Sequence, residues 1–293
     1  MNTWILSYDV GGSHATAGLV HQVTFELQNV RSRRIDSAAA AEGILDALAE
    51  LGNDALGGQS QAVVSGIAMS MPGPFDYEKG ICYIRGLAKY EQLYGVDFRA
   101  SMAERFPKVP AIAVRFINDA AAALLGEIQA GAAKGAPRVI GLTIGTGIGS
   151  AFAVGGRIVT TGPGVPPEGY VYNQPFRDGV AEDFVSGRVI KKMYAKVANN
   201  ECEVKEIARR AAHDAAAKMI FCQFGQMLGE VLLPMVNGFV PDVIVLGGAV
   251  ARSSSLFLPA TREVLQGTKV ELRPSSLHDS AGVIGAAVAW GQT

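Results

Sequence analysis

The sequence has few cysteines, few histidines and almost no net charge. Its 293 residues include three cysteines and four histidines, and the formal net charge is −1. Cys82, Cys202 and Cys222 show neither disulfide nor metal spacing, which is typical of a protein of the reducing cytoplasm. A net charge near zero argues against broad electrostatic attraction to nucleic acid or to an anionic membrane. We therefore expect neither of these partners.

We expect no membrane span in this sequence. The most apolar long segment, residues 219–240, is interrupted by Gln223, Gln226 and Glu230, so we expect a buried helix of a soluble protein there. No basic segment precedes the first strand pattern, at residues 3–10, and we expect no signal peptide. Together with the scattered cysteines, these features predict a cytoplasmic location.

Strand and helix patterns follow one another along the whole chain, which indicates α/β layers. A strand, a glycine turn and a second strand occur twice, at residues 9–18 and 143–153, and this recurrence predicts two similar α/β halves. The length is comfortable for two domains. We expect an N-terminal domain at residues 1–117, completed by a C-terminal helix at 280–293, and a larger C-terminal domain at 118–279.

An Asn-Asp pair, Asn118 and Asp119, stands between an apolar strand pattern at residues 111–117 and an alanine-rich helix pattern at 120–133. A side chain at such a junction can cap the helix. It can also lie at the carboxyl end of a sheet, where α/β proteins hold ligands. There a carboxylate could accept the proton of a substrate hydroxyl while the amide fixes a neighbouring hydroxyl. The position alone leaves both interpretations of Asp119 open.

Three glycine-rich turns accompany this pair, and each follows a strand pattern. Glycines let backbone amides approach a phosphate, while Ser13 and Thr146 add hydroxyl donors and Asp9 could hold Mg²⁺. The first turn alone is a weak signal, because Gly-Gly is common in ordinary hairpins, and the third alone is better explained as a strand-to-helix connection. The second turn is not a dinucleotide fingerprint, because a strand and not a helix follows it. The turns are Asp9-Val10-Gly11-Gly12-Ser13, Gly145-Thr146-Gly147-Ile148-Gly149 and Gly247-Gly248-Ala249-Val250.

With these pieces in this order, the full chain resembles the ROK family of sugar kinases and related repressors, within the sugar kinase, Hsp70 and actin superfamily. The resemblance implies a two-domain actin-like ATPase fold, of ribonuclease H type, with a central cleft. It also implies a homodimer and the ATP-dependent transfer of the γ-phosphoryl group to a hexose hydroxyl, usually the one on C6. The matching segments are residues 9–13, 72–76 with Gly80, 118–120, 145–149, 182–187 and 245–248.

The resemblance also implies a role for individual residues. Asp119 is the expected general base, and Asp9 is expected near Mg²⁺, directly or through water. The expected sugar-binding residues are Gly73, Asn118, Asp119, Glu168, Tyr170 and Glu182. The expected ATP-binding residues are Asp9, Gly11, Gly12, Ser13, Gly145, Thr146, Gly147, Gly247 and Gly248.

One segment departs from the family pattern. Many members carry a sugar-binding Glu-x-x-His followed by a cysteine-rich run that binds a structural zinc ion. Here residues 167–179 contain neither Cys nor His, so we predict no zinc, since this metal needs about four N, S or O ligands. Tyr170 could replace the family's His as a hydroxyl donor to the sugar, or it could be an ordinary packed tyrosine.

Other functions fit the same resemblance less well. Repressors of the family carry an N-terminal helix-turn-helix, whereas this sequence opens with the first strand of the kinase core, so we expect an enzyme. A non-catalytic sugar-sensing protein is the main alternative, and the intact phosphate turns argue against it. An ATPase of the Hsp70 or actin type is disfavoured by the sugar-side loop at Pro72-Gly73 and by the Asn-Asp pair.

Overall fold

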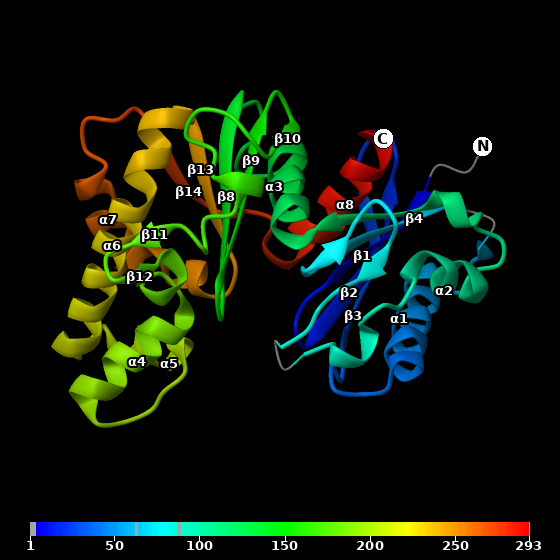
Figure 1. The fold of residues 1–293 in the computed structure, drawn as a ribbon, viewed down its shortest axis with the longest axis horizontal. Helices are drawn as coiled ribbons and strands as arrows, with labels where there is room; N and C mark the ends of the chain where they lie inside the picture. The colour runs from blue at the N-terminus through cyan, green and yellow to red at the C-terminus, as the bar shows by residue number, and fades with distance from the viewer. Residues whose placement is uncertain (1–3, 62–63, 87–88, 293) are drawn as a thin grey trace. The chain divides into compact units, whose positions relative to one another are not determined.

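The computed structural model describes residues 4–61, 64–86 and 89–292. The chain forms two compact units (Figure 1): Met1–Ala130 with Asp279–Thr293, and Gly131–His278. Each unit contains a five-stranded sheet with the same plan, in which two antiparallel pairings are followed by two parallel ones. The two similar α/β halves that the repeated strand–turn–strand pattern predicts are therefore present.

The sheet of the first unit has the strand order β3-β2-β1-β4-β7. Strands β1, β4 and β7 run parallel, and the register pairs Asp9 with Ser70 and Met71 with Asn118. The carboxyl ends of parallel strands lie on the same side of a sheet. The polar residues at the ends of β1, β4 and β7 therefore lie near one another. The strands are β1 Trp4–Val10, β2 His14–His21, β3 Leu27–Arg34, β4 Val64–Met71 and β7 Val114–Asn118.

Helices cover both faces of this sheet. Helix α1 buries Ile44, Leu48, Leu51 and Ala55, which recur at helical spacing, and it ends where Gly57 takes the left-handed conformation (φ 61°). A short hairpin of two-residue strands, β5 Phe75–Asp76 and β6 Ile81–Cys82, belongs to the same unit, and short 3₁₀ turns also occur among its described residues or at its boundary. The helices are α1 Ala41–Leu56, α2 Phe98–Arg105, α3 Asp119–Ala130 and α8 Ala281–Gln292, and the 3₁₀ turns are Glu91–Leu93, Ala111–Ala113 and His278–Ser280.

Helix α8 is buried from Ala281 to Val288 and packs on β1, β4 and α3. It comes so close to α3 that a side-chain carbon on Gly285 would lie 1.7 Å from the Ala122 carbonyl oxygen. A carbon on Gly126 would lie 2.1 Å from the Ala281 carbonyl oxygen. Because α3 packs along α8, it belongs to the first unit, whereas the boundary expected from the sequence lies before it, at residue 117.

The second unit has the strand order β10-β9-β8-β13-β14, with a short hairpin of β11 and β12. Its strands are β8 Arg138–Ile144, β9 Ile148–Val154, β10 Arg157–Val159, β11 Pro175–Phe176, β12 Gly179–Val180, β13 Val243–Gly247 and β14 Glu271–Pro274. Its helices are α4 Gly187–Ala198, α5 Val204–Arg210, α6 Ala215–Phe239 and α7 Leu258–Val264, with 3₁₀ turns at Pro167–Gly169, Ala181–Asp183 and Val250–Leu256.

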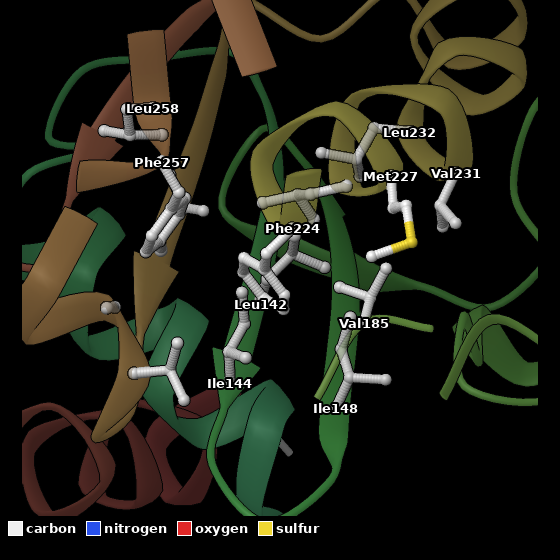
Figure 2. Packing of buried hydrophobic residues seen from close by; sticks show 14 of the residues in the cluster. Leu142, Ile144, Ile148, Val185, Phe224, Met227, Val231, Leu232, Phe257 and Leu258 are labelled. Carbon is white, nitrogen blue, oxygen red and sulfur yellow. The ribbon is translucent and has the colours of Figure 1, made fainter. Parts of the chain in front are cut away.

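Helix α6 forms the centre of the second unit. Asp214 caps it by accepting hydrogen bonds from the Ala216 and Ala217 amides. Figure 2 shows Phe224, Met227 and Leu232 of α6 packed among side chains of β8, β9 and α7. The helix is long and apolar enough to cross a membrane, but 61% of its most apolar window is buried inside the unit. It is a core helix, as its polar interruptions predict.

The close approach of α8 to α3 predicts that Gly285→Ala destabilises the protein. The added methyl group must push the helix away from the Ala122 carbonyl, and overpacking of this kind costs about 1–3 kcal/mol. Urea unfolding measures the difference. Gly291→Ala, in the same helix with no atom within 4 Å of the added carbon, is the matched control and should be neutral or slightly stabilising. Equal stability of the two variants would contradict this packing.

Candidate functional site

The first glycine turn joins β1 to β2 and leaves its backbone exposed. The Gly11 amide donates to the His14 carbonyl at 2.8 Å, and the Tyr90 hydroxyl donates to the Gly11 carbonyl at 2.6 Å. Gly11, Gly12 and Ser13 are all exposed, and the Ser13 hydroxyl lies 3.0 Å from His14 Nδ1. The turn is therefore held from beneath and presents amides and a hydroxyl to solvent, which suits an anion.

Asp9 lies just before this turn, at the end of β1. Its Oδ1 accepts a 2.7 Å hydrogen bond from the hydroxyl of Ser70, the residue paired with it on β4. A side-chain carbon on Gly282 would lie 2.4 Å from the Asp9 carboxyl carbon. Only glycine at that position lets the first turn of α8 lie against the carboxylate. Gly282 and Ser70 thus fix the position of Asp9, and the sequence gives no signal for either role.

The environment of Asp9 disfavours its ionised form. Burial raises the pKa of Asp9 to about 6, the Ser70 hydrogen bond opposes this rise, and the nearby Asp119 and Asp279 carboxylates add to it. A carboxylate with other carboxylates nearby is a suitable oxygen ligand for a hard cation such as Mg²⁺. Among the described residues no group of three or more His, Cys, Asp or Glu side chains has the arrangement of a complete metal site.

The sequence leaves open whether Asp119 caps helix α3 or presents its carboxylate to a ligand. In the structure Asn118 and Asp119 have different roles. Asn118, not Asp119, caps α3: its Oδ1 accepts from the Ala120 and Ala121 amides at 3.1 and 3.2 Å. Asp119 is the first residue of the helix, and its Oδ1 accepts from the Ala120 amide and from Asn118 Nδ2 at 2.9 and 3.0 Å. Within the described chain, Oδ2 of Asp119 has no hydrogen-bond partner from another residue. The pair therefore presents one immobilised carboxylate with one oxygen available.

Burial also raises the pKa of Asp119 above that of an ordinary aspartate. The Ala120 amide, the Lys89 ammonium and the Asn118 amide each favour the ionised form and limit this rise. A carboxylate tuned upward in this way is a better proton acceptor at neutral pH than an exposed one. The same pattern, perturbed titration at a strand end, is common in functional sites.

The loop after β4 lies beside the Asn-Asp pair. Tyr77 donates from its hydroxyl to the Met71 carbonyl at 3.2 Å and accepts from Asn118 Nδ2 at 3.2 Å. A side-chain carbon on Gly73 would lie 3.3 Å from the same hydroxyl. Gly73 and Asn118 are therefore brought together by Tyr77, a residue that sequence reasoning misses although it directly follows the recognisable loop at residues 72–76.

The second glycine turn, between β8 and β9, has its own support in the second unit. Glu182 Oε2 accepts from the Ile148 amide at 3.0 Å, and Glu182 Oε1 accepts from Arg188 at 2.5 Å. A side-chain carbon on Gly147 would lie 2.1 Å from Glu182 Oε2. Thr146 is exposed at the tip. Glu182, expected to contact a sugar, is in this structure the residue against which the turn rests.

The third turn follows β13 and packs on β8. Gly248 has φ 85°, and a side-chain carbon on it would lie 2.5 Å from the Ile144 carbonyl oxygen, so this position requires glycine. Gly247 lies next to it at the end of the strand. The Gly187 amide donates to the Gly145 carbonyl at 2.8 Å. The second and third turns therefore meet at one edge of the sheet.

Glu168 and Tyr170 lie on the loop that follows β10. Ser150 of β9 ties this loop down by donating to the Gly169 carbonyl and accepting from the Val171 amide. Glu168 is exposed with φ 56°, and within the described chain it makes no hydrogen bond or ion pair. The Tyr170 ring is partly buried, 5.5 Å from that of Tyr172.

Because the folded protein disfavours the ionised form of Asp9, we expect the free energy of unfolding to decrease with rising pH. Between pH 3.8 and about 6 the folded chain keeps a proton on Asp9 that the unfolded chain has lost, so the free energy of unfolding decreases as pH rises. Asp9→Asn removes this cost and still accepts from Ser70. At pH 7 it should raise the free energy of unfolding by about 1–3 kcal/mol, nearer the lower figure since Asp9 is partly exposed.

Urea unfolding of wild type and Asp9→Asn at several pH values in EDTA measures this difference. Asp178→Asn, an exposed aspartate without a hydrogen bond among the described residues, is the control and should follow wild type. An Asp9→Asn variant that is no more stable than wild type at pH 7 would contradict the account of Asp9.

Comparison with known proteins places this arrangement in a family. The ROK family model matches residues 5–293. The chain is 26% identical to a glucokinase of Thermotoga maritima over 97% of its own length and 96% of that protein. It is 27% identical to the bifunctional enzyme NanE/NanK of Brucella melitensis over 97% of this chain but only 53% of that longer protein.

Solved structures agree with the sequence comparison. A ROK hexokinase from Thermus thermophilus superposes with a TM-score of 0.78 at 25% identity and covers 97% of both chains. A ROK family glucokinase from Streptomyces griseus, solved with glucose and AMPPNP, has the same fold, with a TM-score of 0.79 at 22% identity over 99% of this chain and 100% of that one. The fold is that of the actin-like ATPases, and the chain belongs to the ROK family.

Proposed function

We propose that this ROK protein is an ATP-dependent sugar kinase that transfers the γ-phosphoryl group to a hexose hydroxyl, the one on C6, with Asp119 as general base. The observation that carries the proposal is the state of Asp119. Its Oδ1 is held by Asn118 and Ala120, while Oδ2 lacks a partner from another residue in the described chain. It stands at a sheet edge that also carries the first glycine turn and Asp9.

In this proposal the chemistry of Asp119 is proton removal. Its carboxylate accepts the proton of the sugar hydroxyl as the oxygen–phosphorus bond forms and ADP leaves. The raised pKa brings the base nearer to neutral pH, and a positioned base of this kind accelerates transfer by about 10²–10⁴-fold. Asn118 keeps the carboxylate oriented through its Nδ2, so the attacking oxygen meets one fixed acceptor.

The remaining sugar contacts are proposed residue by residue, as the family resemblance implies. Gly73 and Asn118, joined through Tyr77, are proposed to bind hydroxyl groups of the sugar. Glu168, Tyr170 and Glu182 are proposed sugar ligands as well. The assignment of Glu182 requires its carboxylate to serve both the second turn and the substrate, because each of its oxygens already accepts a hydrogen bond.

The glycine turns are proposed to bind ATP. In the first turn the exposed backbone of Gly12 and Ser13 and the Ser13 hydroxyl suit phosphate oxygens, and Gly11 leads into it. In the second turn the exposed Thr146 lies between the partly exposed Gly145 and Gly147. Gly247 and Gly248 are assigned to the adenosine side. Asp9 is the residue that would hold Mg²⁺, directly or through water, and the metal would neutralise phosphate charge when bound. Carboxylate neighbours that raise its pKa support this fit.

The family supports further parts of the proposal. Relatives are named glucokinase, and one is a ROK hexokinase. A ROK family transcriptional regulator shares the fold at 20% identity with a TM-score of 0.81, so the fold alone does not separate enzymes from sensors. We assign this chain to the enzymes because of Asp119 and the two phosphate turns. We also propose a cytoplasmic homodimer that needs neither nucleic acid nor a membrane.

Coupled ADP release across hexoses and N-acylated hexosamines tests the function. We expect sugar-dependent ADP release with at least one hexose or hexose derivative, and dependence on Mg²⁺. A chain that binds sugar in calorimetry but neither binds ATP–Mg²⁺ nor releases ADP would be a sugar sensor, contrary to the proposal.

Substitution of the base gives a sharper test. Asp119→Asn keeps the size and one acceptor oxygen but cannot take the proton, so kcat should fall about 10²–10⁴-fold while sugar affinity changes little. Wild-type kcat should decline as pH falls through the raised pKa of Asp119, since only the ionised form is a base. Asp178→Asn serves as the control. Near-normal turnover of Asp119→Asn would refute the base assignment.

A further inference from the structure

Lys89 lies against the first glycine turn, although no motif in the sequence marks it. A side-chain carbon placed on Gly12 would lie 3.5 Å from Lys89 Cδ and 3.6 Å from its Nζ. The ammonium group is also close enough to Asp119 to stabilise the ionised carboxylate. All three residues belong to the first unit. One cation therefore stands near both the turn proposed to bind phosphate and the proposed base.

The neighbouring Tyr90 fixes the segment that carries Lys89. Tyr90 is 1% exposed, its hydroxyl donates to the Gly11 carbonyl at 2.6 Å, and its amide donates to the Ser37 carbonyl at 2.8 Å. Its backbone has φ 56°, a conformation that a non-glycine residue adopts at a cost. Because Tyr90 is hydrogen-bonded to the turn itself, the backbone that carries Lys89 is fixed relative to the turn.

The Lys89 ammonium group acts on Asp119 without touching it, and it has no partner at contact distance among the described residues. Lys79 pairs with Asp76 and Lys191 pairs with Glu203, whereas Lys89 makes no hydrogen bond or ion pair at contact distance within residues 4–61, 64–86 and 89–292. Its side chain is partly buried. An ammonium group removed from part of its water and left unpaired is unfavourable, and an anionic ligand at the turn would offset that cost.

We propose that Lys89 binds the transferred phosphoryl group, between the first glycine turn and the hydroxyl that Asp119 deprotonates. This inference rests on the proposed kinase function. In the transfer, the bond from the γ-phosphorus to the β–γ bridging oxygen breaks, the sugar oxygen bonds to the γ-phosphorus, Asp119 takes the proton and ADP leaves. Lys89 forms no covalent bond. Its charge neutralises the γ-phosphoryl oxygens, which carry most of the charge during transfer.

This role gives Lys89 a preference for the γ-phosphate. A lysine that only supported the turn or only oriented Asp119 would affect nucleoside diphosphate and triphosphate alike. Lys89→Met keeps the length and the apolar stem of the side chain beside Gly12 but removes the charge. Lys89→Gln is a second uncharged variant, and Lys89→Arg restores the charge. Lys134→Met, at an exposed lysine of the second unit, is the matched control.

Calorimetry with AMP-PNP and with ADP, both with Mg²⁺, tests the proposal. Removing one charge-assisted contact should weaken AMP-PNP by about 10- to 100-fold in Lys89→Met and in Lys89→Gln, and ADP by less than about 3-fold. The kcat of sugar phosphorylation should fall about 10²–10³-fold and recover in part in Lys89→Arg. Lys134→Met should match wild type in every measurement.

Equal effects on the two nucleotides, or no effect on either, would overturn the role of Lys89. If wild type binds AMP-PNP but phosphorylates no sugar, the kinase proposal fails while the nucleotide comparison still decides the role of Lys89. If wild type binds no AMP-PNP, both proposals fail. Circular dichroism identifies an unfolded variant, in which case the other uncharged variant gives the result.

Discussion

The close packing of α8 is the constraint on which the first unit depends. Three glycines allow it: Gly282 leaves room for the Asp9 carboxylate, Gly285 for the Ala122 carbonyl, and Gly126 for that of Ala281. Through these contacts one helix fixes the end of β1 and the start of α3 together. The side chains at those two positions, Asp9 and Asp119, are the carboxylates to which the proposed chemistry is assigned. A larger residue at any of the three glycines would move one of these elements.

The same arrangement places negative charge where it is unfavourable. Burial raises the pKa of Asp9 and of Asp119, and the carboxylates of Asp119 and Asp279 raise the pKa of Asp9 further. Lys89 and the Asn118 amide offset part of this cost at Asp119. Destabilised carboxylates of this kind are common at functional sites, because a carboxylate whose ionised form is unfavourable binds cations and protons readily. The second unit repeats the sheet and the glycine turn, but Thr143 stands in β8 where Asp9 stands in β1. The carboxylate of Asp9 therefore has no counterpart at the corresponding position of β8.

The sequence predicts the strand ends and glycine turns because these depend on local patterns. It places Asn118 and Asp119 at a strand–helix junction correctly, but it cannot tell which of them caps the helix, since the choice depends on side-chain rotamers and on Tyr77. It gives no signal for Ser70, Gly282 or Lys89, whose roles arise from contacts between segments far apart in the chain. The contact of Glu182 with the second turn has the same origin. The spacing of residues in the sequence predicts helices, strands and turns, whereas tertiary packing determines which side chains come into contact.

The central claim is that this chain makes a sugar phosphate ester by deprotonating a sugar hydroxyl at Asp119. Proton-coupled ³¹P NMR of the products from ATP–Mg²⁺ and individual hexoses tests it most directly. The account predicts a new phosphomonoester signal split into a triplet by the hydrogens on C6, together with ADP. No new ester with any hexose or N-acylated hexosamine would contradict the claim, and a doublet from an anomeric phosphate would contradict the assigned hydroxyl.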